Sequence, residues 1–590
     1  MLNREIYQKD PSTRKLVNEG VASVNDDVSA KALEVLRYEL ETFVCDGQYE
    51  KGLVHILETY TKNIDHAQQP GVWVSGFYGS GKSHLVKMMR ALWMDTPFPD
   101  GASPRDLANL PASVKDLLKE LSTQAKRHGG LHAASGTLGA GASGSVRLAL
   151  LRIVFKSASL PEQYPVACFV MWLRKQGILD AVKSAVEAKG FDWQEELDNF
   201  YVADGIGDAL TQVKPDLFAS HSACVETLTH MFPSVKDVSS DDMLKAIRQA
   251  LTRDGKFPLT LVVLDEVQQY IGQDSQRSMD VQEAVEACSK NIGGKLLFVG
   301  TGQTAVTGIA NLARLQGRFT VRVELSDADV DTVIRKVILA KRPEKTKAIT
   351  DVMQTNLGEI SRHLAHSSIA HRQDDIAYFP QDYPILPVRR RFWEAALRVL
   401  DQTGTDSQLR NQLSMIHKVI QTNLDASVGT VVPADYIYFD SAEKLLQARI
   451  LPRKVYEKTQ RWLKGSADEK LTARACGLVF LVNKVASKNT ELGIKPTVDT
   501  LADLLVEDLP SGSSALRSKL PSLLDSCDVL MKVGDEYRIQ TEESAAWNDS
   551  FLNQRSNLAN QAHAVEHERD TRIRKPVSYT HLTLPTILRV

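Results

Sequence analysis

Glycines, a lysine and a serine interrupt an apolar run in the stretch GVWVSGFYGSGKSHLV, which covers positions 71–86. The spacing from Gly76 over four residues to Gly81, Lys82 and Ser83 matches a loop whose backbone N–H groups wrap a polyphosphate. VWVSGF predicts a short buried strand before the loop, and KSHLVKMMRALW predicts an amphipathic helix after it. The alternative, a glycine-rich turn that matches by chance, is weakened because both flanking elements are the expected ones.

Each residue type in this loop has a physical reason to be there. The glycines permit positive φ and let the backbone approach phosphates without interference from a Cβ atom. Lys82 is expected to reach the β and γ phosphates of ATP, and Ser83 to give its hydroxyl to Mg²⁺. The candidate nucleotide-binding residues of this stretch are Gly76, Phe77, Tyr78, Gly79, Ser80, Gly81, Lys82, Ser83 and His84.

Two adjacent carboxylates follow a second apolar run, in FPLTLVVLDEVQQYIG at positions 257–272. Residues 259–264 are apolar and β-branched, as expected of a central parallel strand covered on both faces. Asp265 and Glu266 stand at the carboxyl end of this strand, where open α/β sheets place their ligands. Asp265 is expected to hold Mg²⁺, and Glu266 to take a proton from the water that attacks the γ phosphate. Without the glycine loop, an ordinary acidic turn would explain them equally well.

These motifs, GFYGSGKS and LVVLDE in this chain order, resemble those of AAA+ ATPases of the initiator and clamp-loader type. The resemblance implies a parallel α/β sheet, ATP hydrolysis with Mg²⁺, and a homo-oligomer. It also implies roles for residues after the next strand, KLLFVGTGQTAV. Thr301 or Gln303 would lie between the two motifs and orient the attacking water.

Arginines have implied roles as well. Arg318, with Arg314 as its competitor, would project into a neighbouring subunit's site as a finger, the alternative being a solvated arginine at a helix end. Arg410 would sense the γ phosphate from a helical lid, although Arg389, Arg390 and Arg391 compete for that role.

A narrower resemblance rests on LETFVCDGQYEKGLVHILETYTKNI leading into GVWVSGFYGSGKSHLVKMM. These stretches are similar to the P-loop ATPases BrxC of BREX phage-defence systems and PglY of phage-growth-limitation systems. The similarity runs to about residue 575, and because members of that family are longer, the chain is expected to be an N-terminal fragment. The last residues, PVSYTHLTLPTILRV, resemble translated adapter sequence and are expected to be a non-native tail.

Composition sets limits on the kind of protein. With 71 Lys and Arg against 73 Asp and Glu the net charge is −2, so any binding of DNA must come from a local patch. The apolar runs are too short for a membrane span, and the charged N-terminus lacks the apolar core of a signal peptide. The six cysteines form no C-x-x-C pair, which fits a reducing cytoplasm and no zinc ribbon.

The pattern along the chain predicts an α/β AAA+ P-loop core with a parallel sheet, a helical insertion and a helical lid, followed by a winged-helix-like α+β domain. LHAASGT and the glycine-rich loop after it are expected to be a second core strand and a flexible turn. The expected boundaries are an N-terminal helical segment at 1–66, the core at 67–325 with its insertion at about 145–253, the lid at 326–425, a helical linker at 426–465, the winged-helix-like domain at 466–545, a helix at 546–575 and the tail at 576–590.

Two further stretches are ambiguous. RHLAHSSIAH places His363 and His366 three residues apart with His371 beyond, and solvated lid histidines are favoured over a metal site. In the winged-helix-like domain, Arg517 and Lys519 on the third helix are enough to touch phosphates, as are Lys532 and Arg538 on the hairpin, without making a strongly basic face. DNA binding and protein docking are therefore weighed equally for this domain.

Together these features predict a cytoplasmic AAA+ ATPase that couples ATP binding and hydrolysis to assembly or remodelling of a DNA-associated phage-defence complex. Its partners would be copies of itself, other defence proteins and DNA, with no membrane. Two alternatives stay open: a nucleotide-dependent scaffold with incidental hydrolysis, and a recruiter that acts through the DNA-binding domain.

Overall fold

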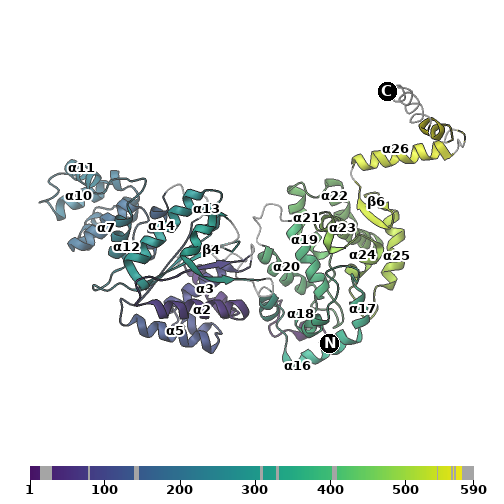
Figure 1. Cartoon of the computed structure of the whole chain (residues 1–590), viewed down its shortest axis with the longest axis horizontal. Helices are drawn as coiled ribbons and strands as arrows, with labels where there is room; N and C mark the ends of the chain where they lie inside the picture. The colour runs from purple at the N-terminus through teal and green to yellow at the C-terminus, as the bar shows by residue number, and fades with distance from the viewer. Residues whose placement is uncertain are drawn as a thin grey trace, which may run out of the picture. The chain divides into compact units, whose positions relative to one another are not determined.

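The computed structural model describes residues 1–12, 29–76, 80–138, 145–305, 310–326, 331–400, 408–540, 542–559, 563 and 566–573. The chain forms two compact units (Figure 1). The sheet unit contains residues 7–340 and 403–418, and the hairpin unit contains residues 1–6, 341–402 and 419–590. The described helices include none that is long and apolar enough to cross a membrane.

A five-stranded sheet in the order β2-β3-β4-β1-β5 forms the centre of the sheet unit, and all its strand pairs are parallel. Its strands are β1 Gly71–Ser75, β2 Leu131–Thr137, β3 Leu259–Asp265, β4 Leu296–Gly302 and β5 Phe319–Glu324. The register pairs Ser75 with Gly302 and Leu264 with Gly300, so the carboxyl ends of β1, β3 and β4 meet at one edge. The three predicted strands around the two motifs, and the strand predicted at LHAASGT, are confirmed.

Helices cover both faces of this sheet, because successive side chains of each strand point to opposite faces. Val72 and Val74 pack in one apolar cluster, while Trp73 between them packs in the other. The first face carries α1 Ala30–Glu41, α2 Gly47–Asn63, α3 Lys82–Met94, α4 Pro104–Leu107 and α5 Ala112–Ala125. The second face carries α6 Val146–Ser157, α12 Ser240–Leu251, α13 Val267–Ile271 and α14 Ser275–Ile292.

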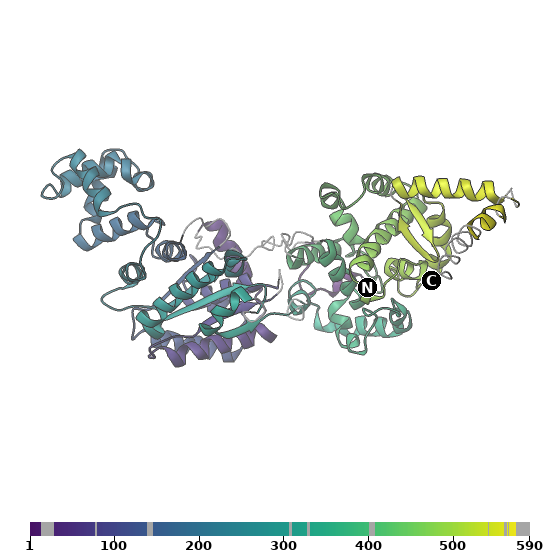
Figure 2. The same cartoon turned by 45° about the horizontal axis from the view of Figure 1, so that its top comes forward.

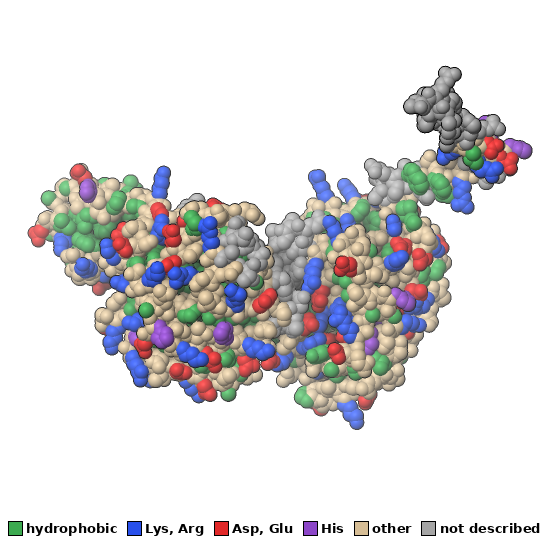
Figure 3. Space-filling model, viewed as in Figure 1, with side chains coloured by type: hydrophobic (Ala, Val, Ile, Leu, Met, Phe, Trp, Pro, Cys, Tyr) green, Lys and Arg blue, Asp and Glu red, His purple; other side chains and the backbone are tan. Residues whose placement is uncertain are grey.

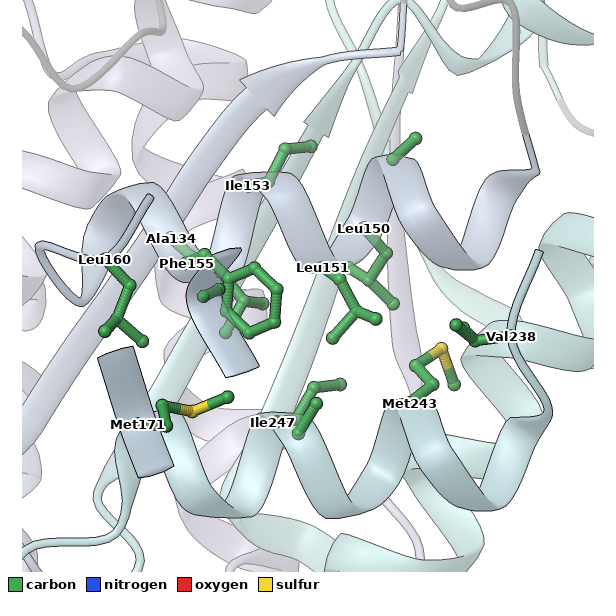
Figure 4. Packing of buried hydrophobic residues seen from close by; sticks show 14 of the residues in the cluster. Ala134, Leu150, Leu151, Ile153, Phe155, Leu160, Met171, Val238, Met243 and Ile247 are labelled. Carbon is green, nitrogen blue, oxygen red and sulfur yellow. The ribbon is translucent and has the colours of Figure 1, made fainter. Parts of the chain in front are cut away.

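The predicted insertion is helical throughout its described part. Its two ends, α6 and α12, lie side by side, with Leu151 and Ile247 between them (Figure 4), and α6 packs on β2. They therefore belong to the layer that buries the sheet. The helices between them extend away from the sheet (Figure 2): α7 Tyr164–Gln176, α8 Leu179–Ala188, α9 Trp193–Asp198, η2 Phe200–Val202, α10 Asp204–Val213 and α11 His221–Met231. Shorter turns of the sheet unit are η3 Gly293–Lys295, η4 Ala310–Gly317 and η5 Ile334–Ile338.

The first part of the hairpin unit is helical. Its elements are η1 Asn3–Ile6, α16 Pro343–Thr355, α17 Leu357–Arg362, η6 Gln373–Tyr378, α18 Phe379–Asp382, α19 Pro387–Leu400, α20 Gln408–Thr422 (its last residues), α21 Tyr436–Gln447 and α22 Arg453–Trp462. The first residues of the chain join it through a bridge between Leu2 and Ser427. The expectation of solvated histidines is wrong for His363, which is buried with its Nε2 3.3 Å from Glu359 Oε1. No group of three or more metal-ligating side chains occurs among the described residues.

The second part of the hairpin unit has the predicted order of three helices and a hairpin. The elements are α23 Ala467–Lys488, η7 Thr490–Leu492, α24 Val498–Leu505, α25 Ser514–Asp525, β6 Leu530–Val533 and β7 Glu536–Ile539, followed by α26 Glu542–Ala559. Ser466 and Glu469 form a capping box that starts α23. Gly534, with φ +65°, makes the turn of the antiparallel hairpin possible. The predicted tail at 576–590 lies outside the described residues.

Four basic side chains of this part, two on α25 and two on the hairpin, are paired with carboxylates of the same unit. Arg517 contacts Asp499 and Asp503, and Lys519 contacts Asp468. On the hairpin, Lys532 Nζ lies 3.6 Å from Asp525, and an Arg538 nitrogen lies 3.3 Å from Glu536. On the face drawn in Figure 3, positive and negative side chains of this unit are likewise interspersed.

Candidate nucleotide-binding site

The glycine loop joins β1 to α3 at the carboxyl edge of the sheet. Gly81 has φ +88°, and a Cβ atom there would lie 2.0 Å from the hydroxyl of Tyr49. A Cβ atom on Gly76 would lie 2.5 Å from Ser80 Oγ. Both positions therefore require glycine, because no side chain has room. Phe77, Tyr78 and Gly79 lie outside the described residues.

Tyr49, on α2, holds the end of this loop. Its hydroxyl donates a 3.0 Å hydrogen bond to the carbonyl oxygen of Ser80. The ring of Phe43 lies edge-on to the rings of Tyr49 and His84, with centroids 6.2 and 5.8 Å away. Burial lowers the pKa of His84 to about 4, so at neutral pH His84 is an uncharged packing residue. Sequence reasoning missed Tyr49, because nothing in the local pattern separates it from the other aromatic core residues of α2.

Lys82 begins α3 and turns back over the loop. Its Nζ donates a 2.8 Å hydrogen bond to the carbonyl oxygen of Gly76. Burial lowers its pKa to about 8, although the nearby carboxylates of Asp265 and Glu266 act in the opposite direction. A partly desolvated cation thus stands between the loop and the end of β3.

Thr301, near the end of β4, contacts the carboxylate of Asp265 and the backbone of Glu266. Its hydroxyl donates to Asp265 Oδ1 and accepts a 3.0 Å hydrogen bond from the backbone N–H of Glu266. Of the two residues predicted to lie between the motifs, Thr301 contacts the second motif directly. Gln303 has an exposed side chain, and its backbone N–H donates to Gln268 Oε1. Gln268, which sequence reasoning also missed, ties α13 to the turn after β4.

Glu266 has an unusual backbone and an altered acidity. Its φ of +58° is left-handed, a conformation that non-glycine residues rarely adopt outside constrained positions. The pKa of its carboxyl group is raised by burial and by the neighbouring charge of Asp265, while Lys82 opposes the shift. A raised pKa makes the carboxylate a better proton acceptor, which is the property required of a general base.

The predicted finger arginine lies at the opposite edge of the sheet. The carbonyl oxygen of Arg318 accepts a 2.8 Å hydrogen bond from Gly71 N–H at the start of β1, and the five residues of β1 span about 16 Å. Its guanidinium lies 2.6 Å from Glu286 Oε1 on α14. Arg314 is exposed in η4. Arg318 is therefore remote from Lys82 of its own subunit.

The competing lid arginines are held inside the hairpin unit. Arg389 is fully buried and donates to the carbonyl oxygens of Val432, Asp503 and Val506. Arg390 donates to Asp382 and Arg391 to both oxygens of Asp375. The side chain of Arg410 lies outside the described part of the chain.

The residues present at the carboxyl edge fit a nucleotide with Mg²⁺. Ser80 belongs to the loop, and its Oγ is buried without a hydrogen-bond partner among the described residues. Gly76 and Gly81 allow the side chains of Ser80 and Tyr49 to pack directly against the backbone of the loop. The hydroxyl of Ser83 and the carboxylate of Asp265 are hard oxygen donors of the type that Mg²⁺ prefers.

A cavity of about 550 Å³ occurs in the same unit. It is lined mainly by residues 41–46, 109–111 and 336–340. Phe43 forms part of this lining and also packs on His84 of α3, so the cavity adjoins the helix that carries Lys82.

The strands and helices define an α/β fold with a parallel five-stranded sheet and a glycine loop at the carboxyl end of β1. No protein-family model matches the chain. Among solved structures, it is similar to the ORC1 protein of Aeropyrum pernix in complex with DNA, with 12% identity over 93% of this chain and 99% of that one and a TM-score of 0.25. It is also similar to Drosophila ORC bound to DNA, with 10% identity over 87% and 92% and a TM-score of 0.25.

Proposed function

We propose that this chain is an AAA+ ATPase that hydrolyses ATP at the carboxyl edge of its sheet. The observation that carries the proposal is the convergence of Lys82, Asp265, Glu266 and Thr301 at the end of a glycine loop. A lysine that neutralises phosphate charge and a carboxylate that accepts the proton of the attacking water are two groups that assist γ-phosphate hydrolysis.

In this proposal, the loop and the N-terminus of α3 bind the phosphates through backbone N–H groups, and Lys82 pairs with the β and γ phosphates. Mg²⁺, held by Ser83 and Asp265, would supply positive charge against the phosphate oxygens. Glu266 accepts the proton of the attacking water. Thr301 keeps Asp265 and the backbone of Glu266 in position through its two hydrogen bonds.

The cavity lined by residues 41–46 and 336–340 is the proposed site of the nucleoside. Its volume is of the size that small-molecule sites in proteins have. The contacts from Phe43 to His84 and from Tyr49 to Ser80 connect this lining to the loop that would hold the phosphates.

The wider role we propose is assembly or remodelling of a DNA-associated phage-defence complex by a cytoplasmic homo-oligomer. The sequence resemblance to BrxC and PglY supports the role in phage defence. The position of Arg318 supports a homo-oligomer. Because it lies at the far edge of the sheet, it is available to a neighbouring subunit once it leaves Glu286.

Replacing Glu266 with glutamine tests the catalytic proposal. The amide is nearly isosteric, but it cannot accept a proton, so turnover should fall by at least about 10²-fold. ATP affinity, measured by direct titration, should stay within about threefold of the wild type, a change much smaller than the expected loss of turnover. Glu283→Gln on the exposed part of α14 is the matched control and should leave turnover unchanged.

A Glu266→Gln rate close to that of the wild type would remove the proposed base and with it the mechanism. The wider role needs a second measurement, ATPase activity and native mass with and without duplex DNA. Stimulation by DNA together with a defined oligomer is the expected result. Hydrolysis that neither DNA nor partner proteins stimulate would favour the nucleotide-dependent scaffold instead.

A further inference from the structure

Two cysteines that are far apart in the sequence meet in the hairpin unit. Cys476 lies on α23, and Cys527 lies in the turn between α25 and β6, 51 positions later. Their sulfur atoms are 3.4 Å apart. All six cysteines of the chain are described, and only this pair brings two sulfurs into contact.

The two thiols differ in their surroundings. Cys476 is fully buried on the face of α23 that packs against α25 and β7. Cys527 keeps 6% of its surface exposed, in a turn whose backbone is fixed by bonds from its N–H to Leu524 and from Leu530 N–H to its carbonyl. Cys527 is therefore the member of the pair that a small solute reaches first.

Hydrogen bonds also distinguish the sulfur of Cys527. The hydrogen bond between the two thiols holds the pKa of Cys527 below its usual value, with a further contribution from Val529 N–H. The same bond and burial raise the pKa of Cys476. Burial raises the pKa of the other four, Cys45, Cys168, Cys224 and Cys288, to between about 11 and about 12. Because the thiolate is the reactive form, Cys527 should react before the others.

We propose that Cys476 and Cys527 form a dithiol site that hydrogen peroxide oxidises to a disulfide. The thiolate of Cys527 attacks one peroxide oxygen, the O–O bond breaks, and hydroxide leaves and takes up a proton to become water. The sulfenic acid formed on Cys527 is then attacked by the sulfur of Cys476, which loses its proton as the S–S bond forms and a second water leaves. Two thiols lose two electrons and two protons, and one peroxide becomes two waters.

The geometry leaves little distance for the sulfurs to travel. A disulfide has an S–S length of about 2.05 Å, so the two sulfurs, now 3.4 Å apart, must approach by only ~1.4 Å. The bond would join α23 to the start of the hairpin, and the loop it closes would enclose α24 and α25. Closing a loop of this length restricts the unfolded chain, so the oxidised hairpin unit should unfold at a higher temperature.

The test uses the full chain, reduced and then treated with hydrogen peroxide. After alkylation of the remaining thiols, peptide mass spectrometry should find Cys476 and Cys527 in one crosslinked species that has lost two hydrogens. The other four cysteines should still be alkylated at that point. The melting temperature of the hairpin unit should rise, and dithiothreitol should reverse both changes.

Two serine variants separate the steps. Cys476→Ser should stop at a sulfenic acid on Cys527 that dimedone traps, and Cys527→Ser should lower the rate of peroxide consumption at least tenfold. Oxidation of another cysteine first, or a folded oxidised protein without the crosslink, would overturn the proposal. If either variant fails to fold, the crosslink and the reversible shift in melting temperature of the wild type still decide the question.

Discussion

Buried charges have different surroundings in the two units. In the sheet unit, Lys82 and Glu266 face each other beside a loop, and burial shifts the pKa of each towards the neutral form. In the hairpin unit, Arg389 and Arg391 donate to sets of carbonyl and carboxylate oxygens that come from distant parts of the same unit. We propose that charges of the first kind are available to a ligand, while those of the second kind hold distant parts of the chain together.

The strongest test of this difference is Lys82→Ala. Removing the side-chain charge that the loop itself is expected to place on the β and γ phosphates should abolish ATP binding while leaving thermal stability nearly unchanged. Isothermal titration with ATP and Mg²⁺ measures the first effect and calorimetry the second. Lys62→Ala, at an exposed site on α2, is the control. Undiminished affinity in Lys82→Ala would show that the lysine is structural after all.

Arg318→Ala tests whether a charge at the opposite end of the sheet from Lys82 also serves hydrolysis. If Arg318 acts on a neighbour's site, hydrolysis should fall by about 10³-fold, the lower end of the range for such fingers, with ATP binding kept. Mixing this variant with Glu266→Gln should restore activity at interfaces that combine two intact halves. Arg314→Ala, tested in parallel, decides between the two candidates. Absence of rescue in verified mixed oligomers would assign Arg318 to its ion pair with Glu286.

Arg389→Met should have the opposite effects to Lys82→Ala: it should lower stability and leave ATP affinity unchanged. It leaves the carbonyl oxygens of Val432, Asp503 and Val506 without their donor in a buried site, which should cost about 3 kcal/mol of unfolding free energy. ATP affinity should not change. Denaturant unfolding measures the loss, and Arg453→Met on the exposed face of α22 should cost less than about 0.5 kcal/mol. A fully stable Arg389→Met protein would contradict the structural role.

The smallest expected effect is a pH dependence of ATP affinity. The pKa of Lys82 is about 8 in the free protein, and bound phosphates would raise it. Below pH 8 the lysine is already charged, whereas above pH 8 it must take up a proton on binding. The dissociation constant should therefore rise by up to about tenfold per pH unit above 8. Titrations in buffers of different ionisation enthalpy would detect the proton uptake at pH 9, and a constant affinity from pH 7.5 to 9.5 would refute it.

Local sequence patterns were sufficient to predict the elements that position the candidate site. The apolar runs before Gly76 and before Asp265 specify β1 and β3, and because parallel strands end at one edge, the two motifs had to meet. The three helices and hairpin of residues 467–539 were also predicted, since their turns and periodicity are local signals.

The contacts that complete the site could not be predicted in the same way. Tyr49 and Ser80, Gln268 and Gln303, and Arg318 and Glu286 are pairs separated by 31 residues or more. Nothing in one sequence records which surfaces of two elements pack together. The burial of His363 was missed for the same reason, because it depends on how α17 packs rather than on its own neighbours in the chain.

The hydroxyl of Tyr49 couples the glycine loop to α2 through its hydrogen bond to Ser80. A displacement of Ser80 would either break their 3.0 Å bond or carry α2 with it. Helix α2 lies so close to β5 that a Cβ on Gly52 would come within 2.6 Å of Val323. Val323 pairs with Val74 near the end of β1, whereas Arg318 precedes the other end of β5. Helix α2 therefore connects the loop to the carboxyl end of β5, and a displacement of Ser80 would be transmitted across the sheet from β1 to its edge strand.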